Sequence, residues 1–314
     1  MEAKGNKMRL GQAAAPAVIT SKKSQQDFYR EFYAYNATFL SLAAGTVGGN
    51  NAFVPNEVRI DSDSAFEFVK TIHRVANPTT YAITNTNEFR LRYKDDASGR
   101  FLMKASEHCK TISGTAAAMT IPNGDIWDNS FMPFIWPRPY IIAASSTFTV
   151  EAADNSGVVN NIYLSFHGNK VRSGQAPWTR KKYRSYVPYV YPIANISSTT
   201  SVPSNPVAGT IVIGANNTVS SPIATDSDAD FLIFKITGKR TGPALVTIKD
   251  GSTDRQWMDQ AMHIDNLIGN GMFPNILPSP RFIERGSVIS TSIQDLSGAT
   301  NSIECTFVGV KLFE

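Results

Sequence analysis

One segment of this chain occurs twice. Residues 136–171 align without a gap with residues 277–312, 141 positions later, and 12 of the 36 aligned pairs are identical. Unrelated sequences would agree at only about 5–7% of positions at ordinary residue usage. The chain therefore contains two copies of one folding unit, and a fold assigned to one copy has to suit the other.

Two shorter blocks extend the duplication upstream. "DSDSAFEFVK" (61–70) matches "DSDADFLIFK" (226–235) at five of ten positions, and "KDDASGRFLM" (94–103) matches "KDGSTDRQWM" (249–258) at four of ten. Successive offsets of 165, 155 and 141 positions leave about ten and about fourteen extra residues in the first copy. Because an insertion inside a strand would reverse its register, we expect both insertions to be loops.

The shorter second copy shows a strand pattern. Segments rich in β-branched and aromatic residues alternate with Gly, Pro, Asn, Asp and Ser, which is typical of an all-β fold. The predicted strands are 210–214, 217–226, 231–238, 244–249, 256–264, 275–283, 288–295 and 303–312. In the last of them Ile303, Cys305 and Phe307 are expected to face inward, so Cys305 is interpreted as a small buried hydrophobe.

Eight strands in about 105 residues is the size of a jelly roll, in which two Greek keys form two packed sheets. The predicted fold is all-β, with two tandem eight-stranded jelly-roll-like β-sandwiches plus an N-terminal arm and short helix. An immunoglobulin-like sandwich is the alternative for each unit, because strand periodicity does not separate the two.

The repeated residues fit turns and sheet edges. "DNSGVVN" and "DLSGATN" are predicted to connect the last two strands of each copy, with Gly at positive φ and Asp and Asn binding local backbone groups. The predicted turn-specifying residues are Asp154, Gly157, Asn160, Asp295, Gly298 and Asn301. The proline-rich segments "FMPFIWPRPYI" and "MFPNILPSPRFI" are expected at sheet edges or in wrapping loops, because proline donates no ladder hydrogen bond.

These patterns divide the chain into four parts. They are an N-terminal arm and aromatic helix (1–45), a first sandwich with loop insertions (46–171), a basic and aromatic connector (172–206) and a second sandwich (207–314). The helix is predicted from a stripe of aromatic residues at spacings of four, three and four, namely Phe28, Phe32, Tyr35 and Phe39. Such a stripe packs into a core or forms a docking face for a neighbouring subunit or a membrane.

The connector is a candidate interaction segment. Its candidate residues are Trp178, Arg180, Lys181, Lys182 and Arg184. Arginine and lysine contact phosphates and aromatic rings stack on bases, so weak contact with nucleic acid is one hypothesis for the connector and for the basic N-terminal arm. Binding to acidic patches of adjacent subunits is the other. A formal charge of +4 on 314 residues does not indicate sequence-specific nucleic-acid binding.

The chain carries little sign of catalytic chemistry. Four histidines, interpreted as exposed strand or loop residues, have no metal-ligand spacing, and no nucleophile elbow or phosphate-binding glycine loop occurs. We therefore expect no enzyme, no cofactor and no catalytic metal. The loop with Asp226, Asp228 and Asp230 could supply calcium ligands; the alternative is a solvated turn. No apolar run reaches 18 residues and no signal peptide is recognised, so we expect neither a membrane span nor export by that route.

The motifs resemble those of bacteriophage virion proteins built from jelly rolls. The shared elements are a P-x-P strand (Pro137/Pro139, Pro278/Pro280), an S-G-x-x-N turn (156–160, 297–301) and a terminal F-x-G-x-K strand (166–170, 307–311). The resemblance implies a non-enzymatic structural subunit of the virion, assembled in the host cytoplasm. It would serve as capsid shell or decoration, or as a head–tail neck or collar component, and its partners would be copies of itself in a symmetric homo-oligomer and other virion proteins.

A binding module is the second hypothesis. Jelly rolls carry receptor or glycan sites in their loops, so a tail or fibre component would expose aromatic residues at one loop end. The candidates are Trp127, Trp136 and Trp178.

Overall fold

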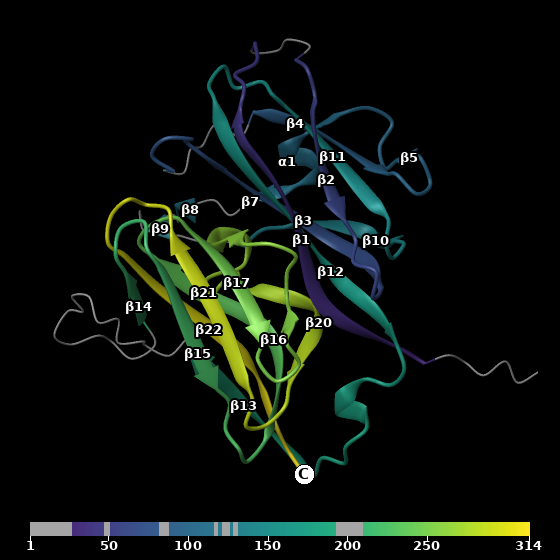
Figure 1. The fold of residues 1–314 in the computed structure, drawn as a ribbon, viewed down its shortest axis with the longest axis vertical. Helices are drawn as coiled ribbons and strands as arrows, with labels where there is room; N and C mark the ends of the chain where they lie inside the picture. The colour runs from purple at the N-terminus through teal and green to yellow at the C-terminus, as the bar shows by residue number, and fades with distance from the viewer. Residues whose placement is uncertain are drawn as a thin grey trace, which may run out of the picture.

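The computed structural model describes residues 27–46, 51–81, 88–115, 119–120, 126–127, 131–192 and 210–314. These residues form two β-sandwiches that lie against each other, the first containing β1 to β12 and the second β13 to β22 (Figure 1). The described helices are short: α1 (Cys109–Ile112), and the 3-10 turns η1 (Pro177–Thr179) and η2 (Ile264–Asn266). Residues 1–26, which contain the predicted N-terminal arm, lie outside the described residues.

The first module has two main sheets, and in each the spatial order of the strands differs from their order along the chain. One contains, from edge to edge, β1 (Phe28–Leu42), β12 (Asn160–Ser173), β3 (Ala65–Ala76) and β10 (Phe134–Ile142). The other contains β2 (Val54–Arg59), β11 (Thr147–Asp154), β4 (Phe89–Asp95) and β5 (Arg100–Phe101). Two short strands add to these sheets: β6 (Glu107–His108) pairs with β4, and β7 (Gly114–Thr115) runs parallel to β3. The strands β8 (Met119–Thr120) and β9 (Ile126–Trp127) form a separate two-stranded sheet.

The second module repeats this order strand for strand. One sheet contains β13 (Ser185–Pro192), β22 (Asn301–Phe313), β16 (Asp230–Arg240) and β20 (Asn275–Ile283), and β14 (Thr210–Ile213) also pairs with β22. The other contains β15 (Thr218–Ala224), β21 (Val288–Asp295), β17 (Ala244–Asp250) and β18 (Arg255–Gln256), and β19 (Met262–His263) pairs with β17.

This connectivity is that of a jelly roll, because the first strand of each module pairs with its last strand, while the edge strand of the other sheet, β2 or β15, pairs with the last but one. The all-β jelly-roll prediction is confirmed and the immunoglobulin-like alternative is wrong. Seven of the eight predicted strands overlap one observed strand each, whereas 256–264 divides into β18 and β19. The proline-rich strands β10 and β20 lie at sheet edges, as their missing donors predict.

The predicted N-terminal helix is wrong, since this segment is the fifteen-residue strand β1. Strand residues point alternately to opposite faces. Tyr35 and Phe39 enter the core of the first module, Phe32 enters the core of the second, and Phe28 is exposed. Aromatic residues on both faces of one strand produced a spacing that imitates the helical period. Three of the four predicted docking residues are thus buried within the chain's own cores.

The connector prediction also needs correction, because residues 185–192 form β13, the first strand of the second module. Its Tyr189 and Tyr191 occupy the register positions that Tyr33 and Tyr35 occupy in β1: Tyr191 lies opposite Phe307, and Tyr35 lies opposite Phe166. The duplication therefore includes a Tyr-x-Tyr strand, 156 positions apart. With only two identities, this block falls below what sequence comparison recognises.

The repeated lysine, aspartates and tyrosines meet at one place in each module. In the first, Lys170 Nζ donates to Asp61 at 2.6 Å and Asp63 at 3.1 Å and lies 4.1 Å from the Tyr33 ring centroid. The Asp61 backbone N–H donates to the Tyr35 hydroxyl at 2.9 Å. This cluster joins the first strand, the last strand and the D-x-D loop between the sheets.

The second module contains the same cluster. Lys311 binds Asp226 and, at 3.3 Å, Asp228, and it lies 4.2 Å from the Tyr189 ring. The Tyr191 hydroxyl donates to Asp226 at 2.8 Å. The hydrogen bond from Lys311, followed by that from Tyr191, lowers the pKa of Asp226. The cluster is therefore strongest with Asp226 ionised and weakens as pH falls through that lowered pKa.

The predicted turns carry matching hydrogen bonds. The Asp154 carboxylate accepts from the Ser156 backbone N–H at 2.6 Å and from Asn160 Nδ2 at 2.9 Å. Asp295 accepts from Ser297 and Asn301 in the same manner, at 3.1 and 3.2 Å. The glycines between them have φ of 78° (Gly157) and 66° (Gly298), a conformation that suits a residue without Cβ.

The glycine of the F-x-G-x-K strand is required by close packing. A Cβ on Gly309 would lie 2.1 Å from the Leu232 carbonyl oxygen, and one on Gly168 would lie 2.0 Å from that of Glu67. We expect Gly309→Ala to lower the free energy of unfolding by about 1–3 kcal/mol, because the sheet backbone has to move. Gly271→Ala is the matched control, with no atom within 4 Å of the added Cβ and an expected change within about 0.5 kcal/mol. Chemical denaturation of both variants measures the difference, and equal stabilities would contradict this reading.

Candidate functional site

The candidate site is the buried contact between the two modules. The outer face of the β1–β12–β3 sheet covers the side of the second module where β20 and β18 form the sheet edges. Ala34 of β1 forms a backbone bridge to this side: its N–H donates to the Trp257 carbonyl at 3.0 Å, and its carbonyl accepts from the Asp259 N–H at 3.2 Å. Phe32 and Ala34 thereby complete the core of the second module.

A buried carboxylate joins the modules electrostatically. Asp265 of η2 is fully buried. It forms an ion pair with Arg74 of β3 at 2.9 Å and accepts hydrogen bonds from Arg240 of β16, one of them at 2.6 Å. Burial opposes ionisation of Asp265, but Arg240 and then Arg74 offset it, so its pKa is lowered. Removing one partner of such a buried group typically costs about 3–5 kcal/mol, so this arrangement resists separation of the modules.

Neutral hydrogen bonds complete the contact. Asn266 Nδ2 donates to the Tyr163 carbonyl and to Ser165 Oγ, both at 3.0 Å, and Ser279 Oγ donates to Asn169 Oδ1 at 2.7 Å. Polar groups buried between protein surfaces need such partners. Tyr163 and Ser165 of β12, which strand alternation predicts to face outward, are therefore buried against the second module.

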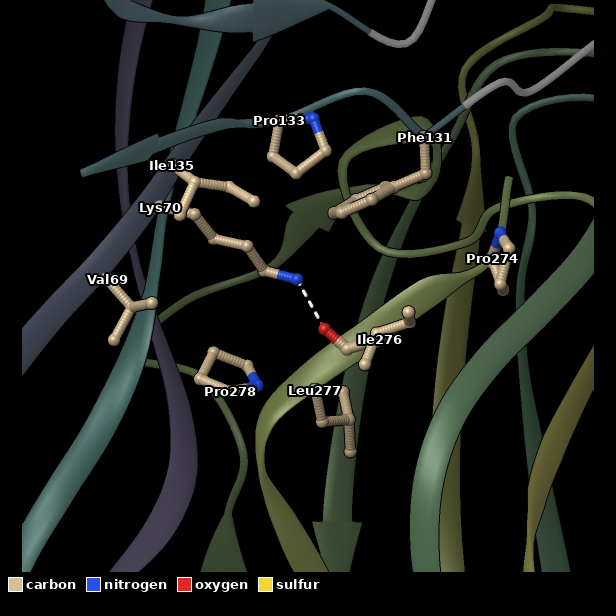
Figure 2. Close-up of a pocket in the computed structure, with 9 residues that line it drawn as sticks. All are labelled: Val69, Lys70, Phe131, Pro133, Ile135, Pro274, Ile276, Leu277 and Pro278. Carbon is tan, nitrogen blue, oxygen red and sulfur yellow. Dashed lines mark hydrogen bonds between the residues drawn. The ribbon is translucent and has the colours of Figure 1, made fainter. Parts of the chain in front are cut away.

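A cavity of about 350 Å³ opens beside this contact, between β3 and β10 of the first module and β20 of the second. Figure 2 shows Lys70 extending across it to the carbonyl oxygen of Ile276. Lys70 Nζ donates to this oxygen at 2.5 Å and to Asn275 Oδ1 at 2.9 Å, and it lies 4.9 Å from the ring centroid of Phe131. The cavity lining is otherwise apolar and consists of Val69, Phe131, Pro133, Ile135, Pro274, Ile276, Leu277 and Pro278.

Burial of Lys70 weakens its charged form. Burial of the Lys70 ammonium lowers its pKa from 10.5 to about 7. His167 lies opposite Lys70 in the β3–β12 register, and burial, then the neighbouring Lys70 charge, lowers its pKa too. Lys70 therefore joins the modules as a hydrogen-bond donor that titrates near neutrality.

This shift predicts how stability depends on pH. Between about pH 7 and 10.5 the unfolded chain holds the Lys70 proton and the folded chain does not, so the free energy of unfolding rises with pH across that window. Lys70→Met should remove this pH-dependent contribution of Lys70. The free energy of unfolding of the variant, relative to that of the parent chain, should therefore fall as pH rises from 7 to 10. Denaturation at several pH values measures it.

Lys235→Met is the control, because Lys235 occupies the equivalent position in the second module and is exposed. An exposed ammonium has no burial penalty to lose. If both variants follow the parent chain's pH profile, the role given to Lys70 is wrong.

The expected exposure of the histidines is wrong for three of the four. His73, His167 and His263 are buried, the first two on the β3–β12 sheet, because that sheet is covered on both faces. His108 is partly exposed and its Nε2 lies 2.9 Å from the Glu88 carboxylate.

The acidic loop of the second module is occupied by cations of the chain itself. Asp226 and Asp228 bind Lys311, whereas Asp230 accepts from Lys181 and Tyr183, both at 2.8 Å. Lys311 supplies the positive charge that a bound calcium ion would supply. Across the described ranges no group of three or more His, Cys, Asp or Glu could hold a metal ion. The two cysteines are buried, and Cys305 lies in the second core as its repeat position predicts.

The connector residues are spread over the surface of the second module. Trp178 packs against Phe282 of β20 with ring centroids 6.2 Å apart, and Lys181 reaches Asp230. Arg180, Lys182 and Arg184 are exposed. Trp136 is half-buried against the first core, and the side chain of Trp127 lies outside the described residues. The connector candidates and the aromatic stripe of β1 therefore do not form one site.

Sequence reasoning missed the residues of the contact itself. Strand alternation places Tyr163 and Ser165 outward, and His167 was interpreted as exposed, yet all three are buried, as is Asn169. One signal existed: the second copy has Glu304, Thr306, Val308 and Val310 at these positions. Divergence of outward positions between copies with the same inward residues indicates different neighbours.

Comparison with known proteins finds solved structures of low similarity to this chain. No protein-family model and no curated protein sequence matches the chain. Similar solved structures include the major capsid protein P2 of bacteriophage PM2, with 13% identity, coverage of 90% of this chain and 98% of that chain, and a TM-score of 0.22. A protein described with the triple jelly roll fold and turret assembly in an archaeal virus has 8% identity, coverage of 92% and 80%, and a TM-score of 0.25.

An enzyme is similar to the same extent. PNGase F, a glycosylasparaginase from Flavobacterium meningosepticum, has 9% identity, coverage of 89% of this chain and 96% of that chain, and a TM-score of 0.21. Viral capsid proteins and an enzyme thus appear together at similarities too low to favour either function. Within the described residues no helix has both the length and the apolar character of a membrane span.

Proposed function

We propose that this chain is a non-enzymatic structural subunit of a bacteriophage particle, located in the virion. The observation that carries the proposal is the buried contact between the modules, in which Phe32, Ala34 and the Arg74–Asp265–Arg240 group hold two jelly rolls in one orientation. A double block of fixed shape suits repeated assembly, because each weak contact is multiplied around a ring or lattice. Capsid shell, decoration, neck and collar are the positions open to it.

The use of the duplicated residues supports a structural role. Lys170 and Lys311 bind their aspartates, the turn aspartates cap backbone groups, and Gly168 and Gly309 permit close strand packing. What the two copies share therefore serves folding. The sequence resemblance to jelly-roll virion proteins, through the P-x-P, S-G-x-x-N and F-x-G-x-K elements, points to the same role.

A receptor- or glycan-binding tail module is the second candidate. Trp178 and Phe282 line a small cavity with the carboxylates of Glu31, Asp250 and Glu284, a combination of aromatic and acidic side chains that sugars favour. Its volume of about 60 Å³ is well below the roughly 300–1,000 Å³ of ordinary ligand pockets. Because this cavity is so small, we rank the binding function below assembly.

Two measurements test the structural role. Quantitative mass spectrometry of purified virions should detect the chain, at high copy number for shell or decoration and at the copy number of one ring for a neck component. Negative-stain microscopy of the purified protein should show rings or lattices. A protein absent from virions, or one that stays monomeric and binds cell-wall glycans, would contradict the proposal.

A further inference from the structure

The outer face of the β13–β22–β16 sheet is the counterpart of the face that the first module buries. In the first module this face covers the β20/β18 side of the second module. In the second module the connector meets one end of this face, where Lys181 binds Asp230 of β16 and Trp178 packs against Phe282 of β20. Along β13 the face is exposed, and its most exposed apolar side chains are Tyr186, 72% exposed, and Val190, 50% exposed. One of two equivalent faces is thus covered and the other is open along β13.

The open face is a continuous apolar surface. In the strand register Tyr186 lies opposite Leu312, Pro188 opposite Val310, and Val190 opposite Val308. Leu232 of β16, which also lies opposite Val310, is buried. The first copy has His167 and Asn169 where the second has Val308 and Val310. Contiguous apolar surface of this kind is typical of protein–protein contacts.

The chain also has the complementary surface. In the first module the side equivalent to β20/β18 lies between β10 and β5, and no equivalent sheet from the described chain covers it. Its apolar side chains include half-buried Leu102, Met103 and Trp136, which pack on the first core, and Phe101 of β5, which is 45% exposed. The open face and this open side are the counterparts, each in the other module, of the two surfaces that already meet within one chain.

We propose that a second copy of this chain docks on the open face through the β10/β5 side of its first module. The contact repeats between chains the one that joins the modules within a chain. Because face and side are different surfaces, association is head-to-tail and continues until a ring closes or a filament forms. This inference rests on the proposed structural role and adds the surface and partner of assembly.

Surface variants test the proposal in sedimentation velocity. The double variant Tyr186→Lys/Val190→Lys places charges on the open face, and we expect at least a 100-fold weaker self-association than that of the parent chain. Phe101→Lys should have the same effect from the opposite side. Leu40→Lys/Val158→Lys is the matched control, since both residues are exposed and apolar but lie away from these surfaces. Thermal unfolding verifies that each variant is folded, and Tyr186→Lys alone replaces the double variant if that one is not.

Mixing the two blocked variants gives the decisive result. The Phe101→Lys chain keeps an intact face and the Tyr186→Lys/Val190→Lys chain keeps an intact side, so the mixture should form a dimer and nothing larger. Self-association of either variant alone at the parent affinity, no dimer in the mixture, or a parent chain that stays monomeric at every concentration would overturn the docking proposal. Presence of the same monomeric protein in virions would leave the structural role standing, which separates the two failures.

Discussion

Both faces of the sheet formed by β1, β12 and β3 are buried, one against its own module and the other against the second. This double burial decides the character of the first module: Tyr35 fills one core while Phe32 fills the other. It also explains the polar residues buried on that sheet, because Lys70, Arg74 and Asn169 find partners across the contact. The relative orientation of the modules follows from matching these groups.

Within each module, the lysine–aspartate–tyrosine cluster stabilises the pairing of the first and last strands. The first and last strands of a jelly roll are distant in sequence, and their pairing is costly in chain entropy. Lys170 and Lys311 attach the last strand to the D-x-D loop and to a tyrosine of the first strand. The two clusters are alike because both modules have to join a first and a last strand that are distant in sequence. The outward faces of the sheets diverged because their neighbours differ.

Much of the fold was predictable from the duplication and the period-two alternation. Cys305 and Phe307 were placed inward, and the edge position of the proline strands followed from their missing donors. The helix over Phe28–Phe39 and the connector over 185–192 were wrong for one reason: both are first strands whose pairing partner lies over 100 residues away. Local patterns carry no information about such a partner.

The sequence by itself determined the number of modules, their strand content and the turn residues, because these depend on local backbone chemistry and on residues repeated at fixed offsets. Only the tertiary structure decided which outward faces are covered. His167 and Val308 occupy the same position in identical folds, yet one is buried between modules and the other lies on an open sheet. Burial of an outward face depends on a surface formed elsewhere in the chain, and no periodicity within the strand encodes it.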